Sequence, residues 1–177
     1  LAADQVTGGS GWERFRKQFD AKPRERLIDI DIASGQARVV LDQQRYMGHP
    51  MFRPFDDSIM GFCHEGPHDL VDARMWFINE DGSNLRQVKE HALHESCMHE
   101  FWVPDGSKLM YVSYTKGDQD RFIGAANPET LENENIMAMP PCAHLMSNFD
   151  GSLLVGDGAG QLGDVSDKEG HAFEADP

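Results

Sequence analysis

The sequence predicts an all-β fold of the β-propeller class. The first observation is a turn of the form Asp-Asp-Ser or Asp-Gly-Ser, which recurs at Ser58, Ser107 and Ser152 with spacings of 49 and 45 residues. This period is typical of propeller blades. The second observation is that short apolar runs flank each turn, as antiparallel strands joined by a hairpin require. We therefore expect repeated four-stranded blades.

At this period, the 177 residues hold between three and four blades. We divide the chain into a partial outer blade with a loop (1–47), two blades (48–97 and 98–142), and the start of a further blade with a loop (143–177). A propeller needs roughly four to eight blades to close and to hide its edge strands. We therefore expect this chain to be an internal part of a larger propeller, completed by the remaining blades or by a second chain.

The individual elements follow from local patterns. Residues 27–32 alternate apolar and acidic side chains, which predicts a half-buried strand, and Ser34-Gly35 turns it into a second strand at 37–41. The charged segment 13–22 is expected to be a loop or a short surface helix. Within an Asp-Gly-Ser turn, glycine accepts a positive φ and aspartate hydrogen-bonds to the nearby backbone.

The later strands are predicted from apolar runs between turn signals. Residues 64–74 form an unusually polar insertion between two strands, and loops of this kind carry sites more often than packing. From residue 156 the chain is rich in Gly and Asp, which predicts a loop. The expected strands are 51–52, 59–63, 75–79, 85–88, 101–103, 109–114, 121–125, 136–139, 145–146 and 153–155.

One histidine precedes each of the three turns. His49, His99 and His144 stand nine, eight and eight residues before the turn serine, just ahead of the strand expected to line the channel. Histidines at one repeat position should converge on one mouth of that channel. Taken singly, each is more often a structural residue, but packing alone gives no reason to repeat an imidazole. The spacing therefore predicts a functional cluster.

The charge of the chain excludes several classes of partner. The formal net charge is −14, from 16 basic and 30 acidic side chains. Such a balance excludes a basic nucleic-acid-binding surface and attraction to anionic membranes. An acidic substrate would need a locally positive cleft or a bound cation. No apolar run has the length of a membrane span.

The cysteines indicate the cellular compartment. Cys63, Cys97 and Cys142 are odd in number and lack the paired spacing of a metal site. We interpret them as free, partly buried thiols in a reducing compartment, and hence predict a cytoplasmic protein.

Several stretches resemble the oligogalacturonate lyase family, whose members are seven-bladed propellers that degrade fragments of pectin. The likeness covers most of residues 44–158. The stretches that carry it include Gly48-His49-Pro50, His64 through Trp76, His99-Glu100-Phe101-Trp102 and His144-Leu145-Met146-Ser147-Asn148.

The resemblance implies a lyase that cleaves short, often unsaturated galacturonate oligomers by β-elimination with Mn²⁺. It implies His99 as the base that abstracts the proton, His144 as a metal ligand and Arg74 as a contact to the substrate carboxylate. His49, His64 and His68 are further candidates to line the substrate cleft, but they could equally cap turns. The remaining metal ligands of the family, a glutamine and two histidines, lie in a later blade, and nothing after His144 matches them.

These residue types suit the implied chemistry. β-Elimination from a uronate removes the C5 proton and expels the C4 oxygen, and histidine, with a pKa of about 6.5, is a suitable base near neutral pH. A divalent cation would act as a Lewis acid on the carboxylate, which Arg74 could also grip with two hydrogen bonds. Alone, Arg74 could instead form a surface ion pair with Asp72.

Two other functions remain open at this point. A non-catalytic propeller scaffold that binds proteins or peptides would show the same turns, but it would not need ordered histidines on the channel side. A truncated homologue without activity would keep the likeness and lack the other metal ligands.

Overall fold

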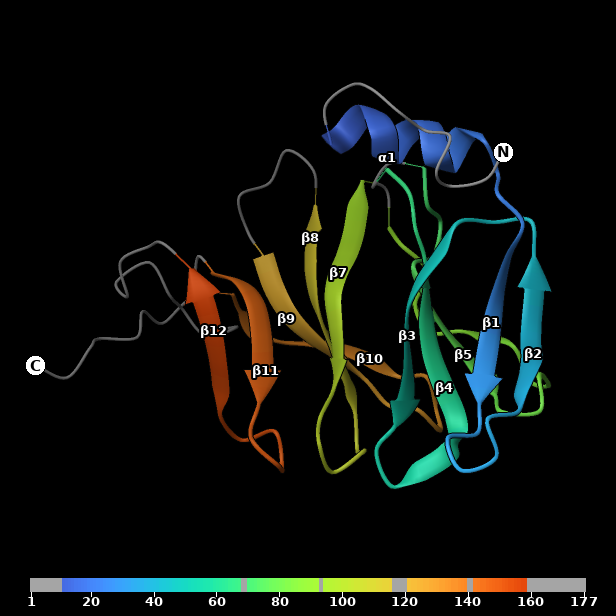
Figure 1. The fold of residues 1–177 in the computed structure, drawn as a ribbon. Coiled ribbons are helices and arrows are strands. Elements are labelled where there is room, and N and C mark those ends of the chain that lie inside the picture. Colours follow the sequence, from blue (N-terminus) through green and yellow to red (C-terminus); the bar gives the residue numbers. More distant parts are fainter. Residues whose placement is uncertain (1–10, 68–69, 93, 116–120, 140–141, 159–177) are drawn as a thin grey trace, which may run out of the picture.

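The computed structural model describes residues 11–67, 70–92, 94–115, 121–139 and 142–158. Within these residues there are one helix and twelve strands, and the strands form four antiparallel sheets that stand side by side (Figure 1). Two of these sheets have four strands each. The prediction of a β fold with four-stranded antiparallel sheets is thus confirmed.

The elements follow one another in chain order within each sheet, so that successive strands are hydrogen-bonded neighbours. The helix α1 (Gly11–Asp20) precedes the sheets. The two-stranded sheets are β1 (Glu25–Ile30) with β2 (Ala37–Gln43), and β11 (Cys142–Ser147) with β12 (Leu154–Gly158). One four-stranded sheet comprises β3 (Met47–Arg53), β4 (Asp56–His64), β5 (Met75–Asn79) and β6 (Arg86–Gln87), and the other β7 (Glu95–Trp102), β8 (Leu109–Thr115), β9 (Arg121–Ala126) and β10 (Asn133–Ala138).

The sequence located most of these elements, with differences at their ends. The segment 13–22 falls mainly within α1, which confirms the helical alternative. The strand β12 continues to Gly158, so the prediction of a loop from residue 156 was wrong for Gly156 to Gly158. The strands β3, β7 and β11 begin before their histidines, which therefore lie inside the strands rather than ahead of them.

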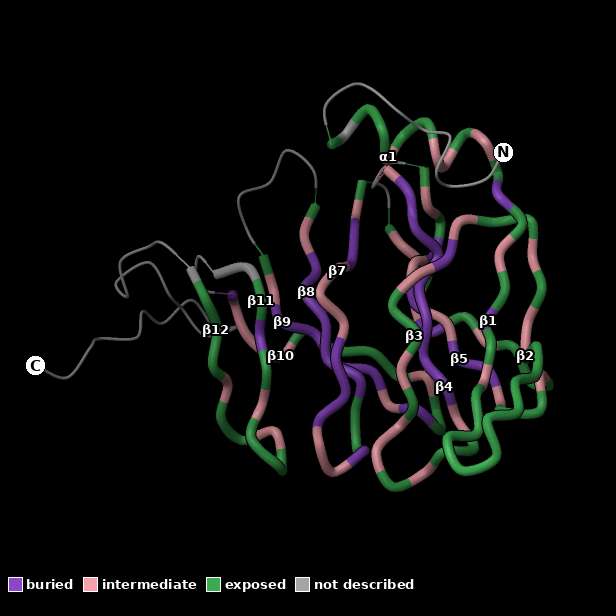
Figure 2. The backbone as a smooth tube through the Cα atoms, viewed as in Figure 1, coloured by how far each residue is buried: buried purple, intermediate pink, exposed green. Residues whose placement is uncertain are grey.

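The core lies between consecutive sheets. One buried cluster, with Leu27, Met60 and Phe62, lies between the first and second sheets. A second, with Phe77 and Trp102, joins the second sheet to the third, and the two rings stack with centroids 5.3 Å apart. A third cluster joins the third and fourth sheets. Buried residues are therefore concentrated in the middle sheets, whereas the described residues of β2 and β12 are half-buried or exposed (Figure 2).

The outer sheets expose apolar side chains. Ile28 and Ile30 of β1 are 56% and 60% exposed, and Val155 of β12 is 70% exposed. The helix α1 covers one end of the assembly (Figure 1), where Phe15 contacts Tyr46 edge to face with ring centroids 5.7 Å apart. No described helix is long and apolar enough to cross a membrane.

Local aspartate bonds define the recurring turns. The backbone N–H of Ser107 donates to Asp105 Oδ1 at 2.8 Å, and that of Ser152 donates to Asp150 Oδ1 at 3.1 Å. Hydrogen bonds from the serine hold the pKa of each aspartate below its ordinary value. The first copy has the same bond, from the N–H of Ser58 to Asp56 Oδ1 at 3.2 Å, but its residue with positive φ is Phe55, at 61°, instead of a glycine.

The turns also connect neighbouring sheets. Arg53 Nε of the second sheet donates to the carbonyl of Gly106 in the third at 2.7 Å. The N–H of Asp105 donates in turn to the carbonyl of Phe149 in the fourth sheet at 3.0 Å. Gly106 has a φ of 75°, and an added Cβ would lie 2.4 Å from the carbonyl oxygen of Pro54. A side chain at this position would therefore push the two turns apart.

We expect Gly106→Ala to lower the free energy of unfolding by about 2–4 kcal/mol, combining an unfavourable φ with a backbone clash. Gly35→Ala is the matched control, because Gly35 has a φ of 70° but nothing lies within 4 Å of an added Cβ. It should cost only about 1 kcal/mol. Urea unfolding followed by tryptophan fluorescence measures both. Equal losses would contradict the contact between the turns.

Candidate active site

The three repeat histidines lie at irregularities of equivalent strands. The register between β3 and β4 shifts between Gly48 and Met51, which brackets His49. The corresponding shift in β7 lies between Met98 and Phe101, and brackets His99. His49 and His99 have φ values of 52° and 54°, a region that side chains other than glycine seldom adopt. A bulge of this kind re-aims a side chain, and here it does so at the same place in two sheets.

The fourth sheet repeats the irregularity, because the register between β11 and β12 shifts between Cys142 and Leu145, around His144. The rings of His99 and His144 are in contact, with centroids 4.8 Å apart and planes at 78°. His49 is near enough for its charge to act on His99. The contact between His99 and His144 is the convergence expected from the spacing of these two histidines.

The surroundings of His99 favour its neutral form. Partial burial lowers the pKa of His99 below its ordinary value, and the neighbouring imidazole of His144 lowers it further. Glu100 acts in the opposite direction, and Arg74 and His49 add smaller lowering effects. A histidine with a pKa below about 6.5 is mostly unprotonated at pH 7 and can accept a proton.

A buried ion cluster stands beside the histidines. Arg74 Nη1 and Nη2 donate to the two carboxylate oxygens of Glu65 at 2.8 and 3.0 Å. Arg74 Nε and Nη2 donate to the two oxygens of Glu100 at 2.5 and 3.4 Å. The side chains of Arg74, Glu65 and Glu100 are only 12%, 8% and 1% exposed. Burial alone would lower the pKa of Arg74, but the charge of Glu100 and the bonds to Glu65 raise it overall.

This cluster changes what Arg74 can do. Both edges of the guanidinium that can hold a carboxylate with two hydrogen bonds are occupied, one by Glu65 and one by Glu100. For Arg74 to grip a substrate carboxylate with two hydrogen bonds, a bond to Glu65 or to Glu100 would have to be released. A single N–H on Nη1 is left for such a contact. The alternative of a surface ion pair with Asp72 is wrong, because Arg74 is buried against other partners.

His64 lies in a packed position. It is 3% exposed, and its Nε2 and Nδ1 contact Gln43 Oε1 and Arg45 Nη1, each at 3.0 Å. Its ring centroid is 4.7 Å from that of Trp76. Burial, together with the charge of Arg45, lowers the pKa of His64 to about 4. Because both ring nitrogens have protein partners, His64 has none to offer a ligand in this arrangement. His68 lies outside the described residues.

His144 is held by an aspartate of the neighbouring strand. The Asp157 carboxylate accepts the backbone N–H of His144 at 2.8 Å, and its Oδ2 lies 3.0 Å from His144 Nδ1. A carboxylate that accepts the Nδ1 proton of a histidine leaves Nε2 as the metal-binding nitrogen. Among the described residues, however, no group of three His, Cys, Asp or Glu side chains could hold a metal ion. These residues therefore fit part of a metal site and do not complete one.

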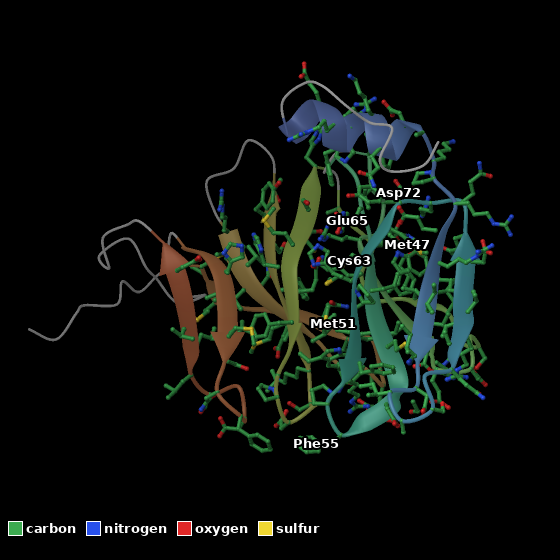
Figure 3. The ribbon with its side chains drawn as sticks, viewed as in Figure 1. Met47, Met51, Phe55, Cys63, Glu65 and Asp72 are labelled. Atoms are coloured by element: carbon green, nitrogen blue, oxygen red, sulfur yellow. The ribbon has the colours of Figure 1, made fainter. Side chains whose placement is uncertain are left out.

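Sequence reasoning missed the two acidic residues of the ion cluster. Glu65 and Glu100 each follow a histidine in the chain, at His64-Glu65 and His99-Glu100, and this repeated pair is a signal that could have drawn attention to them. Figure 3 shows Glu65 toward the end of the sheets covered by α1, with Phe55 at the opposite end. The ion cluster of Glu65, Arg74 and Glu100 thus lies toward the end of the sheets that α1 covers.

The sheets and the histidine cluster define a propeller-like protein with a site where three neighbouring sheets meet. Residues 4–177 match the protein family described as oligogalacturonate lyase. The chain therefore belongs to the oligogalacturonate lyase family.

The relatives agree with this assignment. The chain is 58% identical to an oligogalacturonate lyase of Dickeya dadantii and 56% identical to an oligogalacturonide lyase of Pectobacterium atrosepticum, in each case over 94% of this chain and 43% of the relative. It thus spans less than half the length of these relatives.

Solved structures give the same result. An oligogalacturonate lyase in complex with manganese is 60% identical and superimposes with a TM-score of 0.81 over 84% of this chain and 40% of the other. An oligogalacturonate lyase from Vibrio parahaemolyticus is 57% identical, with a TM-score of 0.83 over 93% of this chain and 44% of the other. The likeness to TolB from Acinetobacter baumannii, at 14% identity and a TM-score of 0.55, concerns the fold alone.

The burial of His64 predicts a loss of stability in acid. The pKa of His64 is about 4 in the folded chain and about 6.5 in an unfolded one, so the unfolded chain binds more protons between these values. The contribution is fully present above pH 6.5, falls as the pH drops through this window and is lost below about pH 4. It amounts to roughly 3 kcal/mol.

Urea unfolding between pH 7 and pH 4 measures this effect. We expect His64→Gln to flatten the dependence of the unfolding free energy on pH. His94→Asn is the control, because His94 is exposed and its φ of 63° suits asparagine. An unchanged slope in His64→Gln would show that other groups cause the acid sensitivity.

Proposed function

We propose that the protein is a lyase that cleaves short, often unsaturated oligogalacturonates by metal-assisted β-elimination in pectin catabolism. Membership of the oligogalacturonate lyase family supports the reaction class. The observation that carries the proposal for these residues is the contact between His99 and His144 at matching strand irregularities, beside a buried arginine. A scaffold for protein binding would have no need of that arrangement.

In this proposal His99 is the base that removes the C5 proton of the sugar. Its lowered pKa keeps it unprotonated at pH 7, as the step requires. Arg74 would contact the substrate carboxylate through its remaining Nη1 proton, and His49 would line the same cleft. His68, which followed from the sequence alone, remains a candidate contact. His64 remains one only if its bonds to Gln43 and Arg45 are released.

The metal of the reaction would be Mn²⁺, because a related lyase was solved with manganese. His144, oriented by Asp157, would be one ligand. When bound, such an ion stabilises negative charge on a carboxylate and offsets the net charge of −14. The other ligands would come from further blades, in keeping with the 43% of the relatives' length that this chain covers.

The wider setting is also proposed. A seven-bladed propeller would cover the exposed apolar faces of β1 and β12 with neighbouring blades or with a second chain. A cytoplasmic location fits the buried, free thiols of Cys63 and Cys97. Burial raises the pKa of Cys63 well above its ordinary value, which keeps the thiol unreactive.

Unsaturated digalacturonate, with Mn²⁺ and with or without a chelator, tests the proposal. Two polypeptides are assayed: the protein itself, and a hybrid in which this chain replaces the matching part of the Dickeya dadantii lyase. We expect metal-dependent release of monomers, measured by chromatography, and a loss of roughly 10²–10⁴-fold in His99→Asn. Asparagine tolerates the positive φ of this position, so the substitution removes the base without a large backbone penalty.

The outcomes separate the candidate functions. Activity in the hybrid alone would show that the catalytic residues of this chain are functional but need the further blades of the propeller. Inactivity of both polypeptides, with native circular dichroism, would overturn the lyase proposal and leave a binding scaffold or an inactive homologue. His94→Asn should keep the activity of the parent.

A further inference from the structure

His49 occupies in β3 the position that His99 occupies in β7. Both lie at a register shift, and both have a left-handed backbone, with φ values of 52° and 54°. The side chain of His49 is 60% exposed, so burial of the ring does not explain why an imidazole stands at this position. Residues in such sparsely populated backbone conformations cluster at functional sites. His49 therefore needs a chemical explanation.

A buried carboxylate contacts this ring. His49 Nε2 lies 3.1 Å from Glu65 Oε1, and the Glu65 side chain is 8% exposed. Gly48 makes room for the contact, because a Cβ at that position would lie 3.0 Å from the same oxygen. Glu65 is fixed in turn by its two bonds to Arg74. The ring of His49 is thus oriented, with Nε2 toward Glu65 and Nδ1 as its other proton-carrying atom.

The buried cluster beside His49 contains more acidic than basic side chains. Glu65 and Glu100 carry two negative charges, and Arg74 supplies one positive charge between them. One negative charge is left in a largely buried place, where an uncompensated charge is costly. His49 contacts Glu65 directly, so a positive charge on its ring would compensate this negative charge. The same cluster ends at Glu100, the residue next to His99, so it links the two histidines.

The proposed β-elimination needs two proton transfers. One proton leaves C5 for His99, the C5 electron pair forms the double bond to C4, and the bond between C4 and its oxygen breaks. The departing oxygen must then gain a proton, since an alkoxide is a poor leaving group.

We propose that His49 is the catalytic acid that protonates the leaving oxygen through Nδ1, and that Glu65 is the residue that positions it. This inference rests on the proposed function. After the step His49 is neutral and keeps the proton on Nε2, which faces Glu65, while His99 holds the proton from C5. Exchange with water restores both rings, so no other reactant is consumed.

Hydrogen exchange at C5 separates the two steps. Unsaturated digalacturonate and Mn²⁺ are incubated in D₂O with the protein and with the hybrid lyase, and deuterium in uncleaved substrate is followed by mass spectrometry. We expect His49→Asn to cleave roughly 10²–10⁴-fold more slowly, while deuterium still enters C5, so that exchange outpaces cleavage. His99→Asn should lose both.

The other variants test the role of the carboxylate. In Glu65→Gln the amide oxygen can still accept Nε2–H but carries no charge, so cleavage should fall by about 10–100-fold with exchange retained. His94→Asn is the matched control, because His94 also has a positive φ, of 63°, and lies outside the cluster. It should cleave at the parental rate.

Three results would overturn the inference. Cleavage by His49→Asn within about threefold of the parent would assign the second proton to His99 or to water. A parallel fall of exchange and cleavage, or an absence of exchange, would give His49 a merely structural role. If neither polypeptide cleaves even with the native residues, the proposed function itself has failed.

A spectroscopic measurement that does not depend on activity tests the contact between His49 and Glu65. In the 177-residue chain, ¹⁵N spectra of the histidine rings should show a protonated Nε2 at His49 whose signal shifts in Glu65→Gln and is unchanged in His94→Asn. An Nε2 without a proton at pH 7 would rule out donation to Glu65 and overturn the proposal whatever the activity.

Discussion

The buried pairing of Arg74 with two carboxylates is the interaction on which the site depends. Arg74 and Glu65 flank the loop between β4 and β5, whereas Glu100 belongs to β7, so the cluster joins two sheets as well as two histidines. Removing one partner of a buried ion pair costs about 3–5 kcal/mol, because the other charge stays behind. The position of the imidazoles and the spacing of the sheets are therefore coupled.

The spacing of the turns was enough to predict the sheets and the contact between His99 and His144. Aspartate and glycine favour particular turns through local interactions, and the spacing of apolar residues indicates which face of a strand is buried. Both features can therefore be recognised in the sequence. The bulges around His49 and His99 leave no such periodic mark. The sequence therefore placed these residues ahead of the strands, when they lie inside them.

The partners of the polar side chains were harder to predict. Arg74 meets Glu100 across 26 residues, and His64 meets Gln43 across 21. Pairings of this kind depend on which distant segments of the chain pack together, and no local sequence pattern predicts that. The same limit explains why His64, in a polar stretch that suggested a cleft, lies against Trp76 instead.

The left-handed backbone at His49 and His99 has a consequence for how this fold can change. Each such residue costs of order 1–3 kcal/mol, a strain that glycine would relieve. Selection for heat resistance alone would thus favour glycine at both positions. Such substitutions would raise the free energy of unfolding and would remove both imidazole groups. Variants selected only for stability would thus lack the side chains proposed for proton transfer.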